Sequence, residues 1–131
     1  MAEHQRFHIK TLDQLREESA GMNLHIPADD DISVLLEPVQ VGGQTMPNRF
    51  VVQPMEGFDA GPDGAPGDLT FRRYTRYARG GFGLIWMEAT AVMEEGRSNP
   101  GQLYLHEKNA GVFKKLIETA KKEAREQFGH E

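Results

Sequence analysis

The stretch that decides the fold lies at residues 68–92, which read DLTFRRYTRYARGGFGLIWMEATAV. Apolar residues recur at helical spacing up to Arg79, and the pair Gly80-Gly81 then ends the helix. A nearly continuous apolar run follows at 83–92, which is typical of a strand buried on both faces. The stretch therefore predicts a helix capped by Asp68, a very short connection and a buried strand.

An earlier strand precedes this helix. Residues 49–54 read RFVVQP, a β-branched and aromatic run, and residues 57–67 are rich in glycine and proline. A strand, a helix and a second buried strand in this order predict a right-handed βαβ unit with parallel strands. The long loops follow the strands and the short one follows the helix. Functional loops are therefore expected at the C-terminal ends of the strands.

Three further elements flank this unit. Two short alternating runs around Gly42-Gly43 predict a β-hairpin at 39–46. Apolar residues at helical spacing from 112 to 124 predict a long helix that ends near Gly129, and 94–109 is predicted to be a loop. Thr11-Leu-Asp-Gln14 has the form of a capping box and predicts a short helix at 11–20.

The predicted fold class is α/β, namely the N-terminal part of a (β/α)8 TIM barrel with an N-terminal β-hairpin. Residues 1–34 are predicted to form an extension with a short helix, and 35–131 the first βα units of the barrel. A closed barrel takes about 250 residues. We therefore expect a fragment or an interrupted reading frame, with a small complete α+β domain as the alternative.

Composition and charge narrow the class of protein. Apolar residues make up 38% and charged residues 27% of the chain, which is typical of a soluble globular protein. The net charge of −5 argues against a general polyanion binder, so no nucleic-acid partner is expected. Cysteine is absent and no apolar run approaches the length of a membrane span, so we expect a cytoplasmic protein without a membrane partner.

The arginines and tyrosines of helix 68–79 leave an alternative function open. Bases and aromatics interleave at 72–77, which read RRYTRY, as they do in RNA-binding proteins. The plainer interpretation places the arginines on the solvated face of a barrel helix and the tyrosines on its packed face. The alternative is a small interaction module that binds RNA or an acidic partner through this helix. A homo-oligomer that buries exposed strand edges is a further possibility.

Metal binding is not predicted. His4 and His8 are four residues apart, but they lie near the chain end with no marked carboxylate partner. The run Asp29-Asp30-Asp31 is interpreted as a solvated loop or a helix-capping cluster.

Two carboxylates lie at the predicted strand ends. Glu88 lies within or at the end of the second strand, where a carboxylate needs a partner, and Arg49 or Arg97 is expected to supply it. Glu56 follows Pro54-Met55 at the corresponding end of the first strand.

Four segments together resemble a known family. These are residues 36–55, 77–85, 88–92 and 95–97, which read LEPVQVGGQTMPNRFVVQPM, YARGGFGLI, EATAV and EGR. In order and spacing they resemble the opening of the old yellow enzyme family of NAD(P)H:flavin oxidoreductases. The resemblance covers roughly residues 35–130.

The resemblance implies an FMN-dependent TIM barrel. Members of the family take hydride from a nicotinamide nucleotide, NADH or NADPH, and commonly pass it to the β-carbon of an activated alkene. The parent protein is thus expected to be an NAD(P)H:flavin oxidoreductase with a small-molecule substrate.

Individual site residues follow from the resemblance alone. Pro54 and Met55 match the turn whose backbone lies along the isoalloxazine, and Ala89 matches the contact from the second strand. Phe58 falls where several members have an aromatic that borders the substrate. Glu56 departs from the pattern, because the family usually has Thr or Cys there, which donates a hydrogen bond to the flavin. An ionised carboxylate cannot donate and would disfavour an anionic reduced flavin. Either Glu56 is protonated, or its side chain turns away, or the flavin of this member has a shifted potential.

The catalytic residues of the family would lie beyond residue 131, as would its phosphate-binding loops. The isolated chain is therefore expected to bind FMN poorly and to be inactive alone.

Overall fold

The computed structural model describes residues 8–130, and the chain divides into two compact units, with the division between Val34 and Leu35. Each unit is described by itself. Within 8–130, no helix is both long and apolar enough to cross a membrane.

In the described part of the first unit, residues 8–34, the α-helix is α1 (Leu12–Gly21), which confirms the predicted helix with a shift of one residue. Thr11 is its N-cap, and the Thr11 hydroxyl accepts a hydrogen bond from the Gln14 N–H at 3.2 Å. The Gln14 side chain in turn accepts from the Lys10 N–H at 2.8 Å, so the reciprocal bond of the capping box is made one residue earlier than usual. Past α1, a short 3₁₀ helix runs from Ser33 to Leu36 across the boundary of the two units.

The second unit opens with the predicted hairpin. Strands β1 (Val39–Val41) and β2 (Gln44–Met46) pair antiparallel, with Val39 opposite Met46. Gly42 and Gly43 form the turn with φ of 55° and 83°, a conformation that glycine adopts without steric cost.

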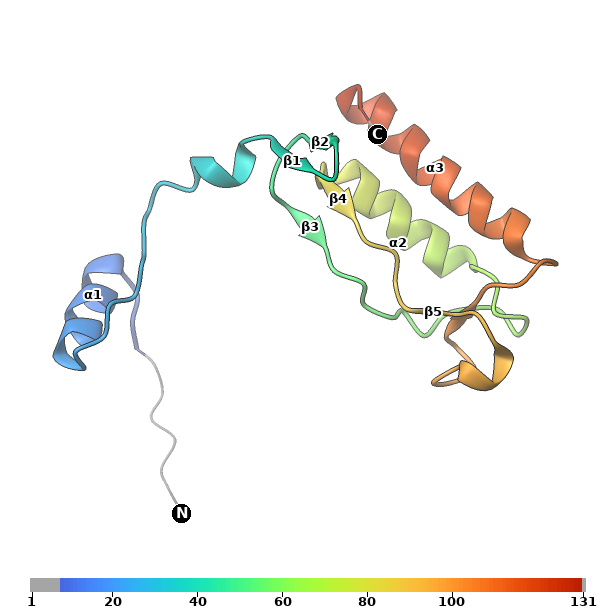
Figure 1. Cartoon of the computed structure of the whole chain (residues 1–131), viewed down its shortest axis with the longest axis horizontal. Coiled ribbons are helices and arrows are strands. Elements are labelled where there is room, and N and C mark those ends of the chain that lie inside the picture. The colour runs from blue at the N-terminus through green and yellow to red at the C-terminus, as the bar shows by residue number, and fades with distance from the viewer. Residues whose placement is uncertain (1–7, 131) are drawn as a thin grey trace, which may run out of the picture. The chain divides into compact units, whose positions relative to one another are not determined.

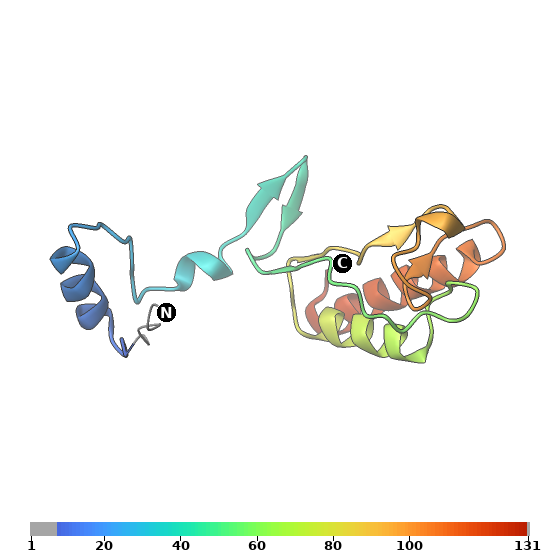
Figure 2. The same cartoon turned by 90° about the horizontal axis from the view of Figure 1, so that it is seen from below.

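The predicted βαβ unit is present. Strand β3 (Val51–Val52), helix α2 (Asp68–Arg79) and strand β4 (Leu84–Ile85) follow one another, and β3 and β4 pair parallel with Val51 opposite Leu84. Figures 1 and 2 show α2 and α3 (Ala110–Phe128) side by side on one face of these strands. The prediction of parallel neighbouring strands is therefore confirmed.

The start of α2 corrects one prediction. Gly67, not Asp68, is the N-cap, and Asp68 is the first helical residue. The Gly67 N–H donates to the Thr70 hydroxyl at 3.3 Å, which is the half of a capping box that the third helical residue supplies.

The apolar run 83–92 does not form one strand, contrary to the prediction. Strand β4 ends at Ile85, and a separate strand β5 (Thr90–Ala91) pairs parallel with β6 (Leu103–Tyr104). The predicted loop 94–109 thus contains β6, as well as the 3₁₀ helix Glu94–Gly96. The run is interrupted at Glu88, whose side chain is buried against α2 instead of lying in a sheet.

Close packing joins the loop 61–66 to the segment that leads into α3. The Tyr104 N–H donates to the Gly64 carbonyl at 3.0 Å, and Asn109, which is 2% exposed, donates to the Asp63 carbonyl at 3.2 Å. Gly64 has a φ of 77°, and a Cβ at this position would collide with Tyr104. Both its conformation and its neighbour therefore require glycine.

The core lies between α2, α3 and the strands. Its buried apolar residues are Met46, Tyr74, Ala78, Leu103, Phe113 and Leu116. On α2 the buried positions are Thr70, Tyr74 and Ala78, spaced four apart, whereas Leu69 is 52% exposed. Helix α3 ends as predicted at Gly129, which has a left-handed φ of 77°.

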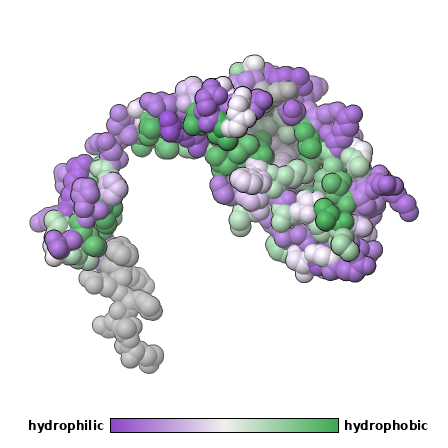
Figure 3. Space-filling model, viewed as in Figure 1, coloured by the Kyte–Doolittle hydropathy of each residue, from purple (hydrophilic) through white to green (hydrophobic). Residues whose placement is uncertain are grey.

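The strands leave apolar surface uncovered. Ile85 and Met87 line a groove with residues of α3, whereas Trp86, which points the other way along an extended chain, is 59% exposed. Phe50, just before β3, is 39% exposed. Figure 3 shows patches of hydrophobic residues, drawn in green, among hydrophilic ones on the visible face of the second unit.

The packing of α3 predicts a large difference between two adjacent substitutions. Leu116 is 1% exposed and Ile117 is 46% exposed. Leu116→Ala is expected to lower the free energy of unfolding by about 2–5 kcal/mol, because it leaves a cavity between α3 and the rest of the core. Ile117→Ala removes a similar volume from a half-exposed site and should cost less than about 1.5 kcal/mol. Urea unfolding followed by circular dichroism measures both; equal losses would contradict the assigned core.

Candidate functional site

The chain that leaves β3 forms an exposed turn at the C-terminal end of the strand. Pro54, Met55 and Phe58 all lie exposed in this turn, Met55 at 74% and Phe58 at 63%. The Met55 N–H donates to the Gln53 carbonyl at 2.8 Å, which tightens the start of the turn. Phe58 adopts a φ of 53°, which is uncommon for a residue other than glycine. The turn thus presents apolar side chains to solvent on a sharply bent backbone.

One side-chain nitrogen is hydrogen-bonded to residues that follow each of the two strands, β3 and β4. Nε2 of the buried Gln102 donates to the Glu56 carboxylate at 3.1 Å and to the Ala89 carbonyl at 3.4 Å. Glu56 follows β3 and Ala89 follows β4, so these two predicted site residues lie at neighbouring positions of one edge. Ala89 itself is exposed.

The Glu56 carboxylate is held by the loop that precedes β6. Its second oxygen accepts hydrogen bonds from the Ser98 hydroxyl at 3.2 Å and from the Asn99 side-chain amide at 3.4 Å. A backbone hydrogen bond from the Ala60 N–H to the Gly101 carbonyl, at 3.0 Å, joins the same two loops. Glu56 is therefore an acceptor of hydrogen bonds from three side chains, and no local sequence pattern marks these partners.

A second group of charges lies beneath the turn. Arg73 of α2 forms an ion pair with Asp59, just past the turn, and another with Glu88 at 2.6 Å. The Glu88 carboxylate also accepts a hydrogen bond from the Gly57 N–H at 2.7 Å, and the Glu88 N–H donates to the Tyr74 hydroxyl at 2.8 Å. Asp59 further accepts a hydrogen bond from the Thr70 hydroxyl at 2.8 Å.

This group corrects two predictions. The partner of Glu88 is Arg73, whereas Arg49 pairs with Glu37 at 3.5 Å and Arg97 donates to backbone carbonyls of its own loop. Arg73 was predicted to lie on the solvated face of its helix. It lies instead over the loops, because its position next to the buried Tyr74 places it at the margin of the packed face.

Hydrogen bonds and burial shift the pKa values of three members of this group. The hydrogen bond from Arg73 lowers the pKa of Asp59, although partial burial opposes the shift. The same contact with Asp59, together with Glu88, raises the pKa of Arg73, again against the effect of burial. Burial raises the pKa of the Tyr74 phenol to about 12. Asp59 and Arg73 are thus held charged and Tyr74 neutral at physiological pH.

These contacts also bear on the alternative function of helix 68–79. Arg73 and Tyr74 are engaged inside the unit, and Arg79 pairs with Glu123 of α3 at 2.6 Å. Arg72 and Arg76 are exposed. Arg73 and Tyr74 of the interleaved pattern at 72–77, and Arg79 just past it, therefore make contacts that hold the fold together.

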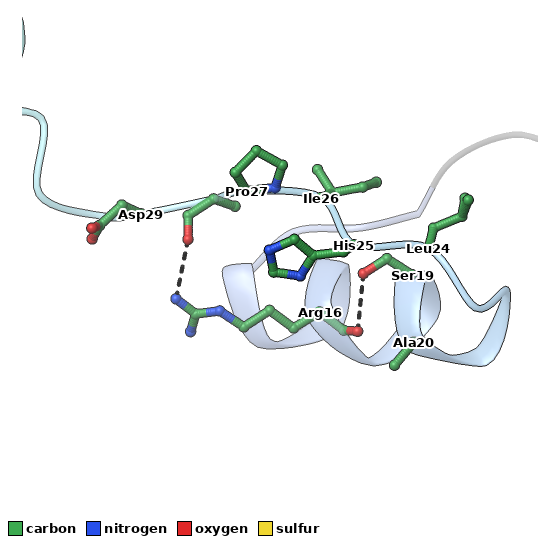
Figure 4. A pocket seen from close by; sticks show the side chains of 9 residues that line it. Arg16, Ser19, Ala20, Leu24, His25, Ile26, Pro27 and Asp29 are labelled. Carbon is green, nitrogen blue, oxygen red and sulfur yellow. Dashed lines mark hydrogen bonds between the residues drawn. The ribbon is translucent and has the colours of Figure 1, made fainter.

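The first unit offers an open hollow beside α1, which Figure 4 shows from close by. The Arg16 guanidinium donates to the Ala28 carbonyl at 3.3 Å, and the Ser19 hydroxyl to the Arg16 carbonyl at 3.0 Å. These polar groups serve the backbone of their own unit and do not converge on a common point. The hollow therefore lacks the geometry of a reactive site.

Residues 8–130 contain no group of three His, Asp or Glu side chains that could hold a metal ion, and His4 lies outside the described residues. In the Asp29–Asp31 run, Asp29 accepts a hydrogen bond from the Asp31 N–H at 3.1 Å, and Asp31 accepts one from the Ser33 N–H at 2.9 Å. These backbone hydrogen bonds lower the pKa of both carboxyls. The run thus caps a turn and the start of the 3₁₀ helix.

Comparison with curated proteins finds similar sequences named NADPH dehydrogenase. The protein from Listeria monocytogenes serotype 4b (strain CLIP80459) is 35% identical over 89 residues, which are 66% of this chain and 26% of the relative. The protein from Listeria innocua serovar 6a is 34% identical over 89 residues, with the same coverage. The chain thus spans about a quarter of the length of the curated relatives it matches.

Solved structures of old yellow enzymes share the fold. Morphinone reductase matches with a TM-score of 0.60 and 27% identity over 68% of this chain and 23% of its own. Old Yellow Enzyme from Pichia sp. AKU4542 matches with a TM-score of 0.63 and 24% identity, over 70% of this chain and 24% of its own. The predicted fold class, the N-terminal part of a TIM barrel, is confirmed.

The sequence profile of one family covers most of the second unit. This profile, described as the NADH:flavin oxidoreductase / NADH oxidase family, matches residues 34–126. The segments that carried the resemblance at 36–55, 77–85, 88–92 and 95–97 all fall within the match. The chain belongs to the NADH:flavin oxidoreductase / NADH oxidase family.

Proposed function

We propose that this chain supplies one wall of the FMN site of an NAD(P)H-dependent oxidoreductase. The observation that carries the proposal is the bridge from Gln102 to both Glu56 and Ala89, which joins the C-terminal ends of two parallel strands. Active sites of parallel α/β barrels lie at this edge. The family relationship supports a flavin as the group that binds there.

The residues of the turn fit the ring system of a flavin. Pro54, Met55 and Ala89 carry uncharged side chains and are exposed at the strand ends, as the contact surface of a flat, largely apolar ring requires. Buried contacts on the other side of the turn hold its backbone, since the Gly57 N–H is bound by Glu88. A preorganised backbone with exposed apolar side chains is what a tightly bound planar group needs.

FMN bound at this wall would accept hydride from NAD(P)H and pass it to an acceptor, for which an electron-poor alkene or a related compound is proposed. The chain would contribute Pro54, Met55 and Ala89 as the surface against which the ring rests. Phe58, exposed in the same turn, is proposed to border the acceptor and to exclude water from it. The left-handed backbone of Phe58 turns its side chain outward at some conformational cost, which is typical of residues in functional sites.

Glu56 is proposed to place a fixed negative charge beside the flavin. Its carboxylate accepts hydrogen bonds from Ser98, Asn99 and Gln102, which hold the carboxylate in place. A negative charge there disfavours an anionic reduced flavin, because like charges repel most strongly where water is excluded. The flavin of this protein is therefore proposed to have a lowered reduction potential, which suits acceptors that are hard to reduce.

The proposed cofactor gives the first test. The purified protein that contains this chain, incubated with FMN and desalted, is expected to retain the visible absorption of a bound flavin, which NADH or NADPH bleaches in the absence of oxygen. Addition of an α,β-unsaturated ketone should restore the absorption. Protein that retains no flavin after incubation would contradict the proposal.

The charge of Glu56 gives a second test. Glu56→Gln keeps the size of the side chain and removes its charge, so the reduction potential of the bound FMN is expected to rise. A shift on the order of 30 mV corresponds to a tenfold change in the preference for reduced over oxidised flavin in a two-electron couple. Glu95→Gln, at an exposed carboxylate of the 94–96 helix, is the matched control and should leave the potential unchanged. An unchanged potential in Glu56→Gln would refute the role of the charge.

A further inference from the structure

The ion pairs of Arg73 join three parts of the chain. The guanidinium comes from α2, Asp59 from the loop after β3, and Glu88 from the segment after β4. The three side chains are little exposed, at 21% for Arg73, 12% for Asp59 and 2% for Glu88. One cation thus bridges two carboxylates that would otherwise repel each other in a poorly hydrated place.

The ion pair of Arg73 with Glu88 is connected to the backbone of the turn proposed to face the flavin. The second oxygen of Glu88 accepts the hydrogen bond from the Gly57 N–H at 2.7 Å. The guanidinium of Arg73 packs against Gly57 so closely that a Cβ at this position would overlap it. Gly57 lies between Glu56 and Phe58, so Arg73 and Glu88 contact the backbone that joins these two residues.

An ion pair elsewhere on the same helix provides the contrast. Arg79 pairs with Glu123 at 2.6 Å, but its side chain is 61% exposed and its partner lies on α3, away from the turn. Exposed ion pairs contribute little to stability, and the desolvation of a buried ion pair can cancel its Coulombic gain. The burial of Arg73 and its contact with the turn therefore point to a role in geometry.

We propose that Arg73 is a positioning residue, which acts through Glu88 and Asp59 to fix the backbone of residues 56–59 for binding the flavin ring. The proposal rests on the proposed function, because it takes the turn 54–58 as the wall of the FMN site. Arg73 itself needs no contact with the flavin. Its effect reaches the site through the Gly57 N–H and through the close approach of the guanidinium to Gly57.

The test compares substitutions of Arg73 and Arg79 in the protein that contains this chain. Arg73→Met is expected to increase hydrogen exchange at the Gly57 amide at least tenfold, beyond any change in global stability, and to weaken FMN binding at least tenfold. Arg73→Lys should recover part of both, because a single ammonium cannot reproduce the planar fork that reaches two carboxylates. Arg79→Met is the matched control and should change FMN binding less than twofold.

A second variant keeps the test decisive if Arg73→Met does not fold. Gly57→Ala removes no charge, but its methyl group displaces the guanidinium from the turn. It is expected to weaken FMN binding at least tenfold while the protein stays folded. If the unaltered protein binds no FMN, the proposed function fails. If the unaltered protein and the Arg73 and Gly57 variants bind FMN equally, the positioning role alone is overturned.

Discussion

The parallel pairing of β3 with β4 is the constraint on which the rest of the structure depends. Two parallel neighbours require a crossover, and α2 provides it on one face of the strands. The return from α2 into β4 is made by a short glycine connection, whereas the chain between β3 and α2 is long. All elaborated loops therefore gather at one edge, where Gln102 can reach both Glu56 and Ala89.

Much of the fold could be predicted because its signals are local. The Gly42-Gly43 pair marks the hairpin, Gly80-Gly81 the end of α2, and Gly129 the end of α3, and each acts within a few residues of itself. Parallel pairing followed from the order of elements, since a strand, a helix and a strand of buried type leave few other arrangements. The site residues Pro54, Met55, Glu56, Phe58 and Ala89 came from family resemblance and remain predictions.

The side-chain network of the site could not be predicted, because it depends on contacts between distant residues that no periodicity marks. Arg73 lies at the margin of the packed face of α2, and only the fold shows that Asp59 and Glu88 converge on it. The division of the apolar run 83–92 was missed for the same reason, since Glu88, which lies between β4 and β5, is buried through its contact with the distant Arg73. Gln102 is polar in a region predicted to be a loop, so nothing set it apart.

Trp86, on the uncovered side of the strands, is an intrinsic fluorescence probe. Trp86 is the one tryptophan in the sequence, and more than half of its surface meets water. Indole emission shifts to shorter wavelength when water is replaced by apolar neighbours, so the colour of this fluorescence records whether anything lies over that side of β4. The residue thus distinguishes a bare from a covered barrel strand, in a chain whose other aromatic residues emit far more weakly.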